Sequence, residues 1–256
     1  MTCEREFFPN RPDAARHAAM RERPAGRVVM KQAWRNLLFL HWRYDPVEVQ
    51  RLLPEGLTVD TYDGAAWVGI VPFFMCDVRP VYAPTVPGLS NFLELNVRTY
   101  VYDAGGNPGV WFFSLDASNP IAVWIARSFF KLPYYHAQMR ARATPASVDY
   151  WSQRKGLEAD HFAWQPFGTS HQAEPESLEY FLVERYRLYS INPAKKSLHH
   201  GQVHHRPYEL QEAKVLEWGT QLLAPAGLSA RDTPFDHAIC AADVKVDIHP
   251  LIRNTN

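Results

Sequence analysis

The sequence predicts a β-rich α+β fold. Its 256 residues include eight Trp, twelve Tyr and fourteen Phe, and its aromatic and β-branched runs are broken by 20 Pro and 13 Gly, as is typical of strands joined by turns. Apolar residues make up 46% of the chain, enough for a sizeable core. Because no linker or repeat divides the chain, we expect a flexible N-terminal arm with one short helix, residues 1–28, and a single domain, residues 29–256.

The domain is expected to begin with a strand, a short helix and a hairpin. The aromatic segment 33–44 is the candidate strand. Residues 45–56 follow as a short helix, because Asp45 can cap the first turn and a Pro and a Gly close the segment. The pair Asp63-Gly64 predicts a tight hairpin turn between the next two strands.

A second hairpin is expected around the turn sequence DAGGNPG. The strand before this turn alternates between an apolar face and a polar face. The polar face carries Glu94, Asn96, Arg98 and Tyr100. The strand after the turn, VWFFSLDAS, is mostly apolar, which indicates that both of its faces are covered. A curled sheet around an internal pocket would have this effect.

The second half of the chain is expected to contain a helix followed mostly by strands. Residues 120–130 have helical length and spacing, with Asn119 as a candidate N-cap and Pro133 just beyond their end. Most of the remaining chain is expected to form strands, among them residues 179–191. A last short helix is expected near 232–242.

The overall composition argues against several classes of partner. The charges balance, with 27 acidic and 27 basic residues, so we expect no nucleic-acid partner, because duplex binding depends on neutralising phosphates. No apolar run approaches the about 20 residues that span a bilayer, and the N-terminal segment lacks the apolar stretch of a secretory signal, so we expect no membrane partner. Three widely spaced cysteines are typical of a reducing cytosol and predict a cytoplasmic protein. Nucleotide-binding motifs are missing, and no cofactor is expected.

A histidine-rich segment, HHGQVHHRP, has two interpretations. In a strand, His200 and His204 would share one face and could hold a metal. A metal site also needs a carboxylate or cysteine and an enclosing shell. A polar, exposed strand pair around Gly201 is therefore the favoured interpretation, and no metal is expected. The histidines of this segment are His199, His200, His204 and His205.

Four segments resemble a known family: FLHWRYDPVEVQRLLPEGLTVDTYDGAAWVGIVPFFM, LELNVRTYV, GVWFFSLDAS and ARSFFKLPYYHAQM. Over roughly residues 31–245 the chain is similar to the YqjF-like proteins, a bacterial family of unknown function in the acetoacetate-decarboxylase-like superfamily. The resemblance implies an antiparallel, strongly curved β-cone or barrel with a few peripheral helices. It also implies a mainly apolar internal pocket.

The resemblance does not carry over the Schiff-base chemistry of the decarboxylase. In that enzyme the reactive lysine directly follows a proline, and a second lysine comes next. Here the resemblance puts Tyr134 and Tyr135 at these two positions. Lys131 lies three residues earlier, at a helix end, where a lysine usually reaches for water and the terminal carbonyl groups. A second pocket glutamate, expected near Ala66 and Trp67, is also missing.

Other pocket groups of the decarboxylase are retained in the resemblance. Arg35 and Glu94 fall where the decarboxylase has a pocket arginine and a pocket glutamate, and Arg127 matches the arginine before its lysine pair. The residues predicted to be catalytic are Glu94 and Tyr134. The residues predicted to bind substrate are Arg35, Arg98, Arg127 and Tyr135.

Three functions stay open on this evidence. The first is an enzyme without a lysine, in which Tyr134 polarises a carbonyl oxygen, Glu94 is a base whose pKa burial raises, and Arg35 holds a carboxylate. Its reaction would be the enolisation, dehydration, cyclisation or hydrolysis of a small oxo-acid or polyketide-like compound. The second is a non-catalytic protein that binds such a small molecule. The third is a structural protein with a filled core and a buried ion pair.

Two structural observations would separate these functions. A cavity of a few hundred Å³ lined by Glu94 and Tyr134 would argue against a filled core. A strongly raised pKa of Glu94 in that cavity would favour the enzyme over the binding protein. Exposed sheet edges and the remote relatives also favour a homo-oligomer.

Overall fold

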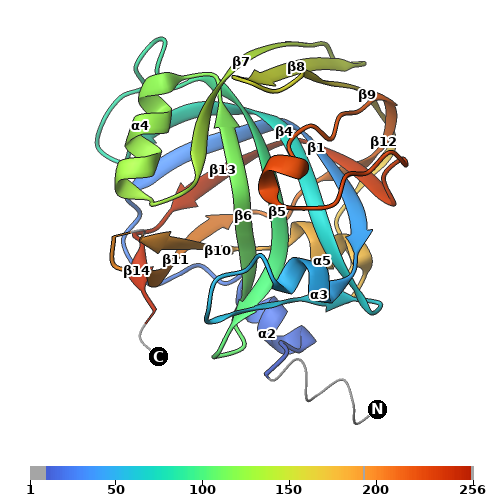
Figure 1. Cartoon of the computed structure of the whole chain (residues 1–256). Helices are drawn as coiled ribbons and strands as arrows, with labels where there is room; N and C mark the ends of the chain where they lie inside the picture. Colours follow the sequence, from blue (N-terminus) through green and yellow to red (C-terminus); the bar gives the residue numbers. More distant parts are fainter. Residues whose placement is uncertain (1–9, 193, 255–256) are drawn as a thin grey trace.

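A strongly curved sheet forms the body of the protein, and a few short helices lie outside it (Figure 1). The computed structural model describes residues 10–192 and 194–254. The strands are β1 (Met30–Tyr44), β2 (Leu57–Val59), β3 (Thr61–Tyr62), β4 (Ala65–Pro80), β5 (Phe92–Asp103), β6 (Pro108–Ala117), β7 (Tyr134–Ala143), β8 (Val148–Arg154), β9 (Asp160–His171), β10 (Arg187–Asn192), β11 (Ser197–His205), β12 (Leu210–Glu217), β13 (His237–Ile248) and β14 (Ile252–Arg253). The helices are α2 (Ala14–Ala19), α3 (Pro46–Gln50), α4 (Pro120–Phe129), α5 (Leu178–Val183) and the 3-10 turn η1 (Ala224–Ala226). Within the described residues, every helix is too short or too polar to cross a membrane.

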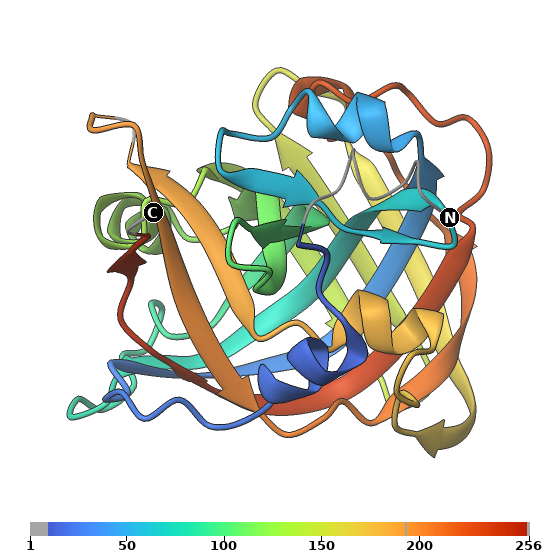
Figure 2. The same ribbon diagram turned by 90° about the horizontal axis from the view of Figure 1, so that it is seen from below.

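The sheet closes on itself in a ring. Pairing of β5 with β6 completes a ring that runs from β6 through β7, β8, β9, β12, β13, β1 and β4 back to β5. On one side β10 and β11 form a second link between β6 and β13 (Figure 2). Among the described strands, neighbours are antiparallel except where β6 pairs with β7 and with β10. The predicted curved, mainly antiparallel sheet is confirmed, with these two parallel contacts as exceptions.

Strands β1 and β6 are largely buried on both faces. In β1, Leu37 belongs to one hydrophobic core and its neighbour Leu38 to another. In β6, Val110 belongs to the first of these cores and Phe113 packs against the second. Successive side chains of a strand point to opposite faces, so a continuous apolar run supplies both cores. The predicted two-sided burial of the strand after the second hairpin turn is therefore confirmed.

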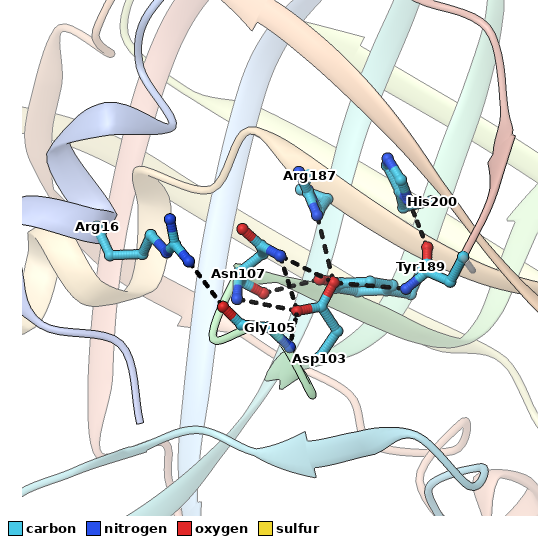
Figure 3. A network of polar contacts seen from close by, with 8 residues as sticks. Arg16, Asp103, Gly105, Asn107, Arg187, Tyr189 and His200 are labelled. Carbon is cyan, nitrogen blue, oxygen red and sulfur yellow. Dashed lines mark hydrogen bonds and ion pairs between the residues drawn. The ribbon is translucent and has the colours of Figure 1, made fainter. Parts of the chain in front are cut away.

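Both predicted hairpin turns are present. Asp63 and Gly64 have φ values of 51° and 69°, and positive φ at both central residues is what a two-residue type I′ turn requires. At the β5–β6 turn the Asp103 carboxylate accepts hydrogen bonds from the backbone N–H groups of Gly105 and Asn107, each at 3.0 Å (Figure 3). The local turn chemistry that was readable in the sequence thus sets these connections.

The helices predicted over residues 45–56 and 120–130 are also present, although the first is shorter than predicted. Asp45 caps α3 by accepting a hydrogen bond from the N–H of Val47 at 2.8 Å. Asn119 caps α4 by accepting from the N–H groups of Ile121 and Ala122. Capping of this kind satisfies donors that a helix cannot pair internally.

Replacing Asn119 with alanine is expected to lower the free energy of unfolding by about 1–2 kcal/mol. The change removes the acceptor of two backbone N–H groups, at 3.0 and 3.2 Å, and the donor to the carbonyl of Gly88 at 2.8 Å. Denaturant unfolding measures the loss. Asn119→Asp keeps the capping oxygen and should recover most of it, whereas an unchanged midpoint in the alanine variant would contradict the prediction.

Two predicted elements are wrong. Residues 179–191, expected as one strand, begin in α5 and end in β10. Ser177 starts this helix, because its hydroxyl accepts a hydrogen bond from the N–H of Tyr180 at 3.1 Å. The segment 232–242, expected as a helix, instead enters β13 at His237, where long pairing with β1 overrides the local preference.

Residues 10–28 lie against the ring, with α2 at the end of the molecule that Figure 2 views. Arg16 donates to the carbonyl of Gly105 at 2.7 Å, and Arg23 pairs with Asp247 at 2.6 Å. This part of the predicted arm is therefore attached to the domain. Residues 1–9 of the predicted arm lie outside the described residues.

Candidate active site

A cavity of about 250 Å³ lies on the face of the sheet that β10 and β11 cover, opposite the face that packs toward β8 and β9. Its wall comes mainly from β1, β4, β5 and β6, with one side of α4 and parts of β10 and β11. Most of the lining side chains are aliphatic or aromatic. The polar exceptions are Gln32, Arg79, Glu94, Asn96, Arg98, Tyr134, Arg185, Arg187 and Tyr208. A mainly apolar cavity with a few polar groups is typical of small-molecule sites.

Glu94 and Tyr134 meet in the wall of this cavity. The Tyr134 hydroxyl donates a hydrogen bond to Oε2 of Glu94 at 2.7 Å. Both side chains are buried, with exposed fractions of 2% and 8%. Burial raises the pKa of Glu94 to about 7, although the hydrogen bonds from Tyr134 and Asn96 favour its charged form. Near neutral pH both protonation states of this carboxyl group are therefore populated.

Strand pairing places the two side chains together. β6 lies between β5 and β7, and its Leu115 pairs with Asn96 on one side and with Tyr134 on the other. The chain reaches β7 from the end of α4 through Lys131, which has a φ of 55°. Residues about 40 positions apart in the sequence thus form one hydrogen-bonded pair.

Replacing Tyr134 with phenylalanine is expected to raise the pKa of Glu94 above its present value of about 7. The lost O–H stabilises the carboxylate, so its removal favours the protonated acid. The pH titration of the Glu94 carboxyl carbon by NMR measures the change. Tyr150→Phe is the matched control, because the Tyr150 hydroxyl donates to the backbone carbonyl of Glu94 at 2.8 Å instead of to its carboxylate. A pKa that falls in the Tyr134 variant would refute the expectation.

Arg98 lines the same cavity on the same face of β5 as Glu94. Its terminal nitrogen donates to the carbonyl of Leu182 at 3.2 Å and to the hydroxyl of Tyr100 at 3.4 Å. Its guanidinium lies over the ring of Phe39 at 5.3 Å. Its Nε has no hydrogen-bond partner among the described residues. Of the arginines predicted to bind substrate, Arg98 is the one that the structure brings to the cavity.

Arg35, predicted in the pocket, lies outside it. It pairs with Asp77 at 3.3 Å, and both side chains are about half exposed, at 49% and 54%. The reason is a β-bulge in β1, where Asn36 has a φ of 49° and the pairing with β4 shifts by one residue. Trp34 therefore faces the cavity on one side of the bulge and Leu37 on the other, while Arg35 points away.

Arg127 and Tyr135, the other predicted binding residues, also lie outside the cavity lining. α4 lines the cavity with Ala122, Ile125 and Ala126, which leaves the adjacent Arg127 exposed. Tyr135 follows Tyr134 in a strand, so it points to the opposite face. There the Arg154 guanidinium lies over its ring at 4.1 Å. These two residues therefore do not contact the interior of this cavity.

Sequence reasoning missed three arginines of the cavity: Arg79 of β4, and Arg185 and Arg187. Arg185 pairs with the buried Asp60 at 2.8 Å, and Arg187 pairs with Asp103 at 3.4 Å (Figure 3). Arg185 and Arg187 follow α5, in the segment that was expected to be a single strand. The cap residue Ser177 and the acidic first turn were the signal that could have revealed this helix and the change of direction after it.

The lysine and histidine candidates contribute nothing to the cavity wall. Lys131 donates through Nζ to the carbonyl of Ser128 at the end of α4, as expected for a lysine at this position. His205 is buried instead of exposed, and its ring stacks on Tyr186 with centroids 4.6 Å apart. Within the described part of the chain, no group of three or more His, Cys, Asp or Glu is arranged to hold a metal.

Sequence comparison finds close similarity to one family. The chain matches the model of the DUF2071 family, described as an uncharacterized conserved protein, over residues 31–245. It is also 42% identical over 194 residues to the uncharacterized protein YqjF of Bacillus subtilis (strain 168), which covers 75% of this chain and 79% of YqjF.

Solved structures with the same fold are more distant in sequence. An acetoacetate-decarboxylase-like enzyme from Sphingomonas wittichii RW1 matches with a TM-score of 0.63 and 15% identity, covering 90% of this chain and 94% of that chain. The enduracididine biosynthesis enzyme MppR in complex with pyruvate matches with a TM-score of 0.63 and 13% identity, covering 91% of this chain and 93% of that chain. At these identities the likeness concerns the fold alone.

Proposed function

Since the chain belongs to the DUF2071 family and has an acetoacetate-decarboxylase-like fold, we propose that it is an enzyme that enolises a small carbonyl compound in its cavity. The observation that carries this proposal is the buried pair of Glu94 and Tyr134, with the pKa of Glu94 raised to about 7. A general base is most effective when its pKa lies near the working pH. A group with this property inside a cavity is typical of catalytic sites.

The proposed reaction needs only these two side chains. The Glu94 carboxylate removes a proton from the carbon next to the carbonyl, and the electrons of that C–H bond form the C=C bond of an enolate. The Tyr134 O–H, which donates to Glu94 in the free protein, donates instead to the developing oxyanion. Glu94 then returns the proton to carbon. No other reactant is consumed, and dehydration or cyclisation would continue from the same enolate.

A lysine Schiff base has no part in this proposal. The lining residues of the cavity in the described chain do not include a lysine, and the Lys131 ammonium is engaged with the end of α4. Tyr134 is a poor nucleophile, because burial and the neighbouring Glu94 raise its pKa well above the usual value. Its hydroxyl is therefore suited to donate a hydrogen bond to a carbonyl oxygen.

The fold relative MppR supports a carbonyl ligand in a pocket of this type, since it was solved in complex with pyruvate. Pyruvate carries a carbonyl next to a carbon with exchangeable hydrogens, which is the chemistry proposed here. The apolar wall of the present cavity favours compounds with a larger hydrocarbon part.

The test is the exchange of α-hydrogens in D₂O, followed by NMR for a panel of ketones and oxo-acids. Enolisation predicts exchange above the buffer rate for those members of the panel that bind. Compounds that bind without faster exchange would favour the non-catalytic binding protein instead. If no carbonyl compound binds at all, both versions of the small-molecule function fail.

A further inference from the structure

The cavity has two chemically different ends along a single strand. Glu94, Asn96 and Arg98 alternate along β5 and all line the cavity. The acid end contains Glu94 and Tyr134, beside β7. The basic end contains Arg98. Four residues of extended chain separate the two Cα atoms by roughly 13 Å.

Apart from Asn96, the wall between these ends is apolar. The residues of β4 that pair with Glu94 and Asn96 are Phe73 and Val71, and both line the cavity. On β6, Leu115, which pairs with Asn96, lines the cavity as well. A ligand that reaches from one end to the other therefore needs a hydrocarbon middle.

The basic end carries more positive than negative charge. Arg98 and Arg185 both lie over the ring of Tyr100, at 5.6 and 5.2 Å. Of these two, Arg185 has a carboxylate partner, Asp60, at 2.8 Å. Arg98 donates to uncharged oxygen atoms, and it forms no ion pair with any carboxylate among the described residues.

The other charged groups near this end already have partners other than Arg98. Arg187 is paired with Asp103 at the β5–β6 turn (Figure 3). Glu184 accepts a hydrogen bond from Tyr186 and pairs with Arg21 at 3.7 Å. Neither carboxylate compensates the charge of Arg98.

Several polar atoms at the cavity are also without partners. They are Nε of Arg98, Nη2 of Arg185, Nε of Arg187 and Oδ1 of Asn96, each buried and unpaired among the described residues. Leaving buried polar groups unpaired is costly, so they mark where a ligand would contribute hydrogen bonds.

Resting on the proposed function, we propose that the ligand is an elongated organic acid. Its carboxylate binds Arg98, its apolar chain lies between β4 and β6, and its reacting carbonyl lies beside Glu94 and Tyr134. Arg98 is suited to a carboxylate, because a guanidinium can offer two parallel N–H donors to its two oxygens. A two- or three-carbon oxo-acid is too short to contact both ends, whereas a chain of about six to nine carbons spans the remaining gap.

The test uses unreactive straight-chain acids, so it does not depend on turnover. Isothermal titration with butanoate, hexanoate, octanoate and decanoate should show affinity rising about fourfold for each added methylene until the chain fills the cavity. Octanol, which has the same chain without the charge, should bind about tenfold more weakly than octanoate or worse. Octyl phosphate tests whether the basic end prefers a phosphate group to a carboxylate.

Variants identify the end of the cavity that holds the charge. Arg98→Gln should remove the preference for octanoate over octanol. If the glutamine variant is unstable, Arg98→Lys is measured instead. It retains a positive charge and should keep much of the preference. Arg35→Gln, an arginine outside the cavity, is the matched control and should bind like the native protein. Glu94→Gln should retain the preference, because Glu94 lies at the other end.

The outcomes separate this inference from the proposed function. Acids that bind no better than octanol, or a preference that survives in Arg98→Gln, would overturn the inference and leave the enolisation proposal standing. Tighter binding of octyl phosphate would overturn the assignment to a carboxylate. Absence of α-hydrogen exchange with every carbonyl compound would remove the proposed function, while the titration with unreactive acids would still report on Arg98.

Discussion

Replacing Glu94 with glutamine is expected to lower the rate of α-hydrogen exchange by at least about 100-fold, the usual contribution of a positioned general base. Glutamine has nearly the same shape, and its carbonyl oxygen can still accept the hydrogen bond from Tyr134. The cavity and the binding of ligand should therefore be preserved. A variant that binds the carbonyl compound normally but no longer exchanges its hydrogens would show that Glu94 acts in the chemical step.

The pH dependence of exchange provides a second measure of the same residue. The active form of Glu94 is the carboxylate, so the rate should rise as the pH increases through about 7 and level off above it. Glu184→Gln is a matched control. Glu184 is also a buried glutamate that accepts a hydrogen bond from a tyrosine, but it lies outside the cavity lining. Equal losses of exchange in both folded variants would contradict the role of Glu94.

Replacing Asp60 with asparagine is expected to lower the free energy of unfolding by about 3–5 kcal/mol. Asp60 and Arg185 are both buried, with side-chain exposures of 2% and 1%, and their charged atoms are 2.8 Å apart. Removing the carboxylate leaves the Arg185 guanidinium buried without a negative partner. Because Arg185 also lines the cavity, the same change should disturb its basic end.

Denaturant unfolding of two variants tests this expectation. Asp77→Asn removes the acidic partner of the exposed Arg35, which is the same chemical change at a surface pair. This control should cost no more than about 1 kcal/mol, since water and salt already screen such pairs. If both variants lose the same small amount of stability, the Asp60–Arg185 pair does not contribute the expected free energy of unfolding.

Local signals predicted much of the framework. The Asp63-Gly64 turn, the Asp45 and Asn119 caps and the two-sided strands all follow from interactions within a few residues, and all are present. The segment 179–191 was misjudged, because its apolar residues suit either a strand or a buried helix turn. Boundaries of this kind depend on which surface the segment finally packs against.

The candidate site was predictable only in part. Alternation along β5 placed Glu94 and Arg98 on one face, and that face does line the cavity. The resemblance put Arg35 in the pocket, but the bulge at Asn36 reverses which side chains of β1 face the cavity, and Arg35 points away. A bulge is a property of how two strands pair, so a period-two pattern in one strand does not reveal it.

The sequence by itself determined the strand-rich class, the turns and the polar face of β5, because these follow from side-chain alternation and from turn and cap chemistry, which act over short distances. Only the tertiary structure decided that Tyr134 donates to Glu94, that the pKa of Glu94 rises to about 7, and that Arg98 stays without a carboxylate. Burial and charge compensation come from groups on β7, in α5 and before β10, which reach β5 only when these segments pack over its cavity face. The chemistry of the cavity is therefore a consequence of that long-range packing.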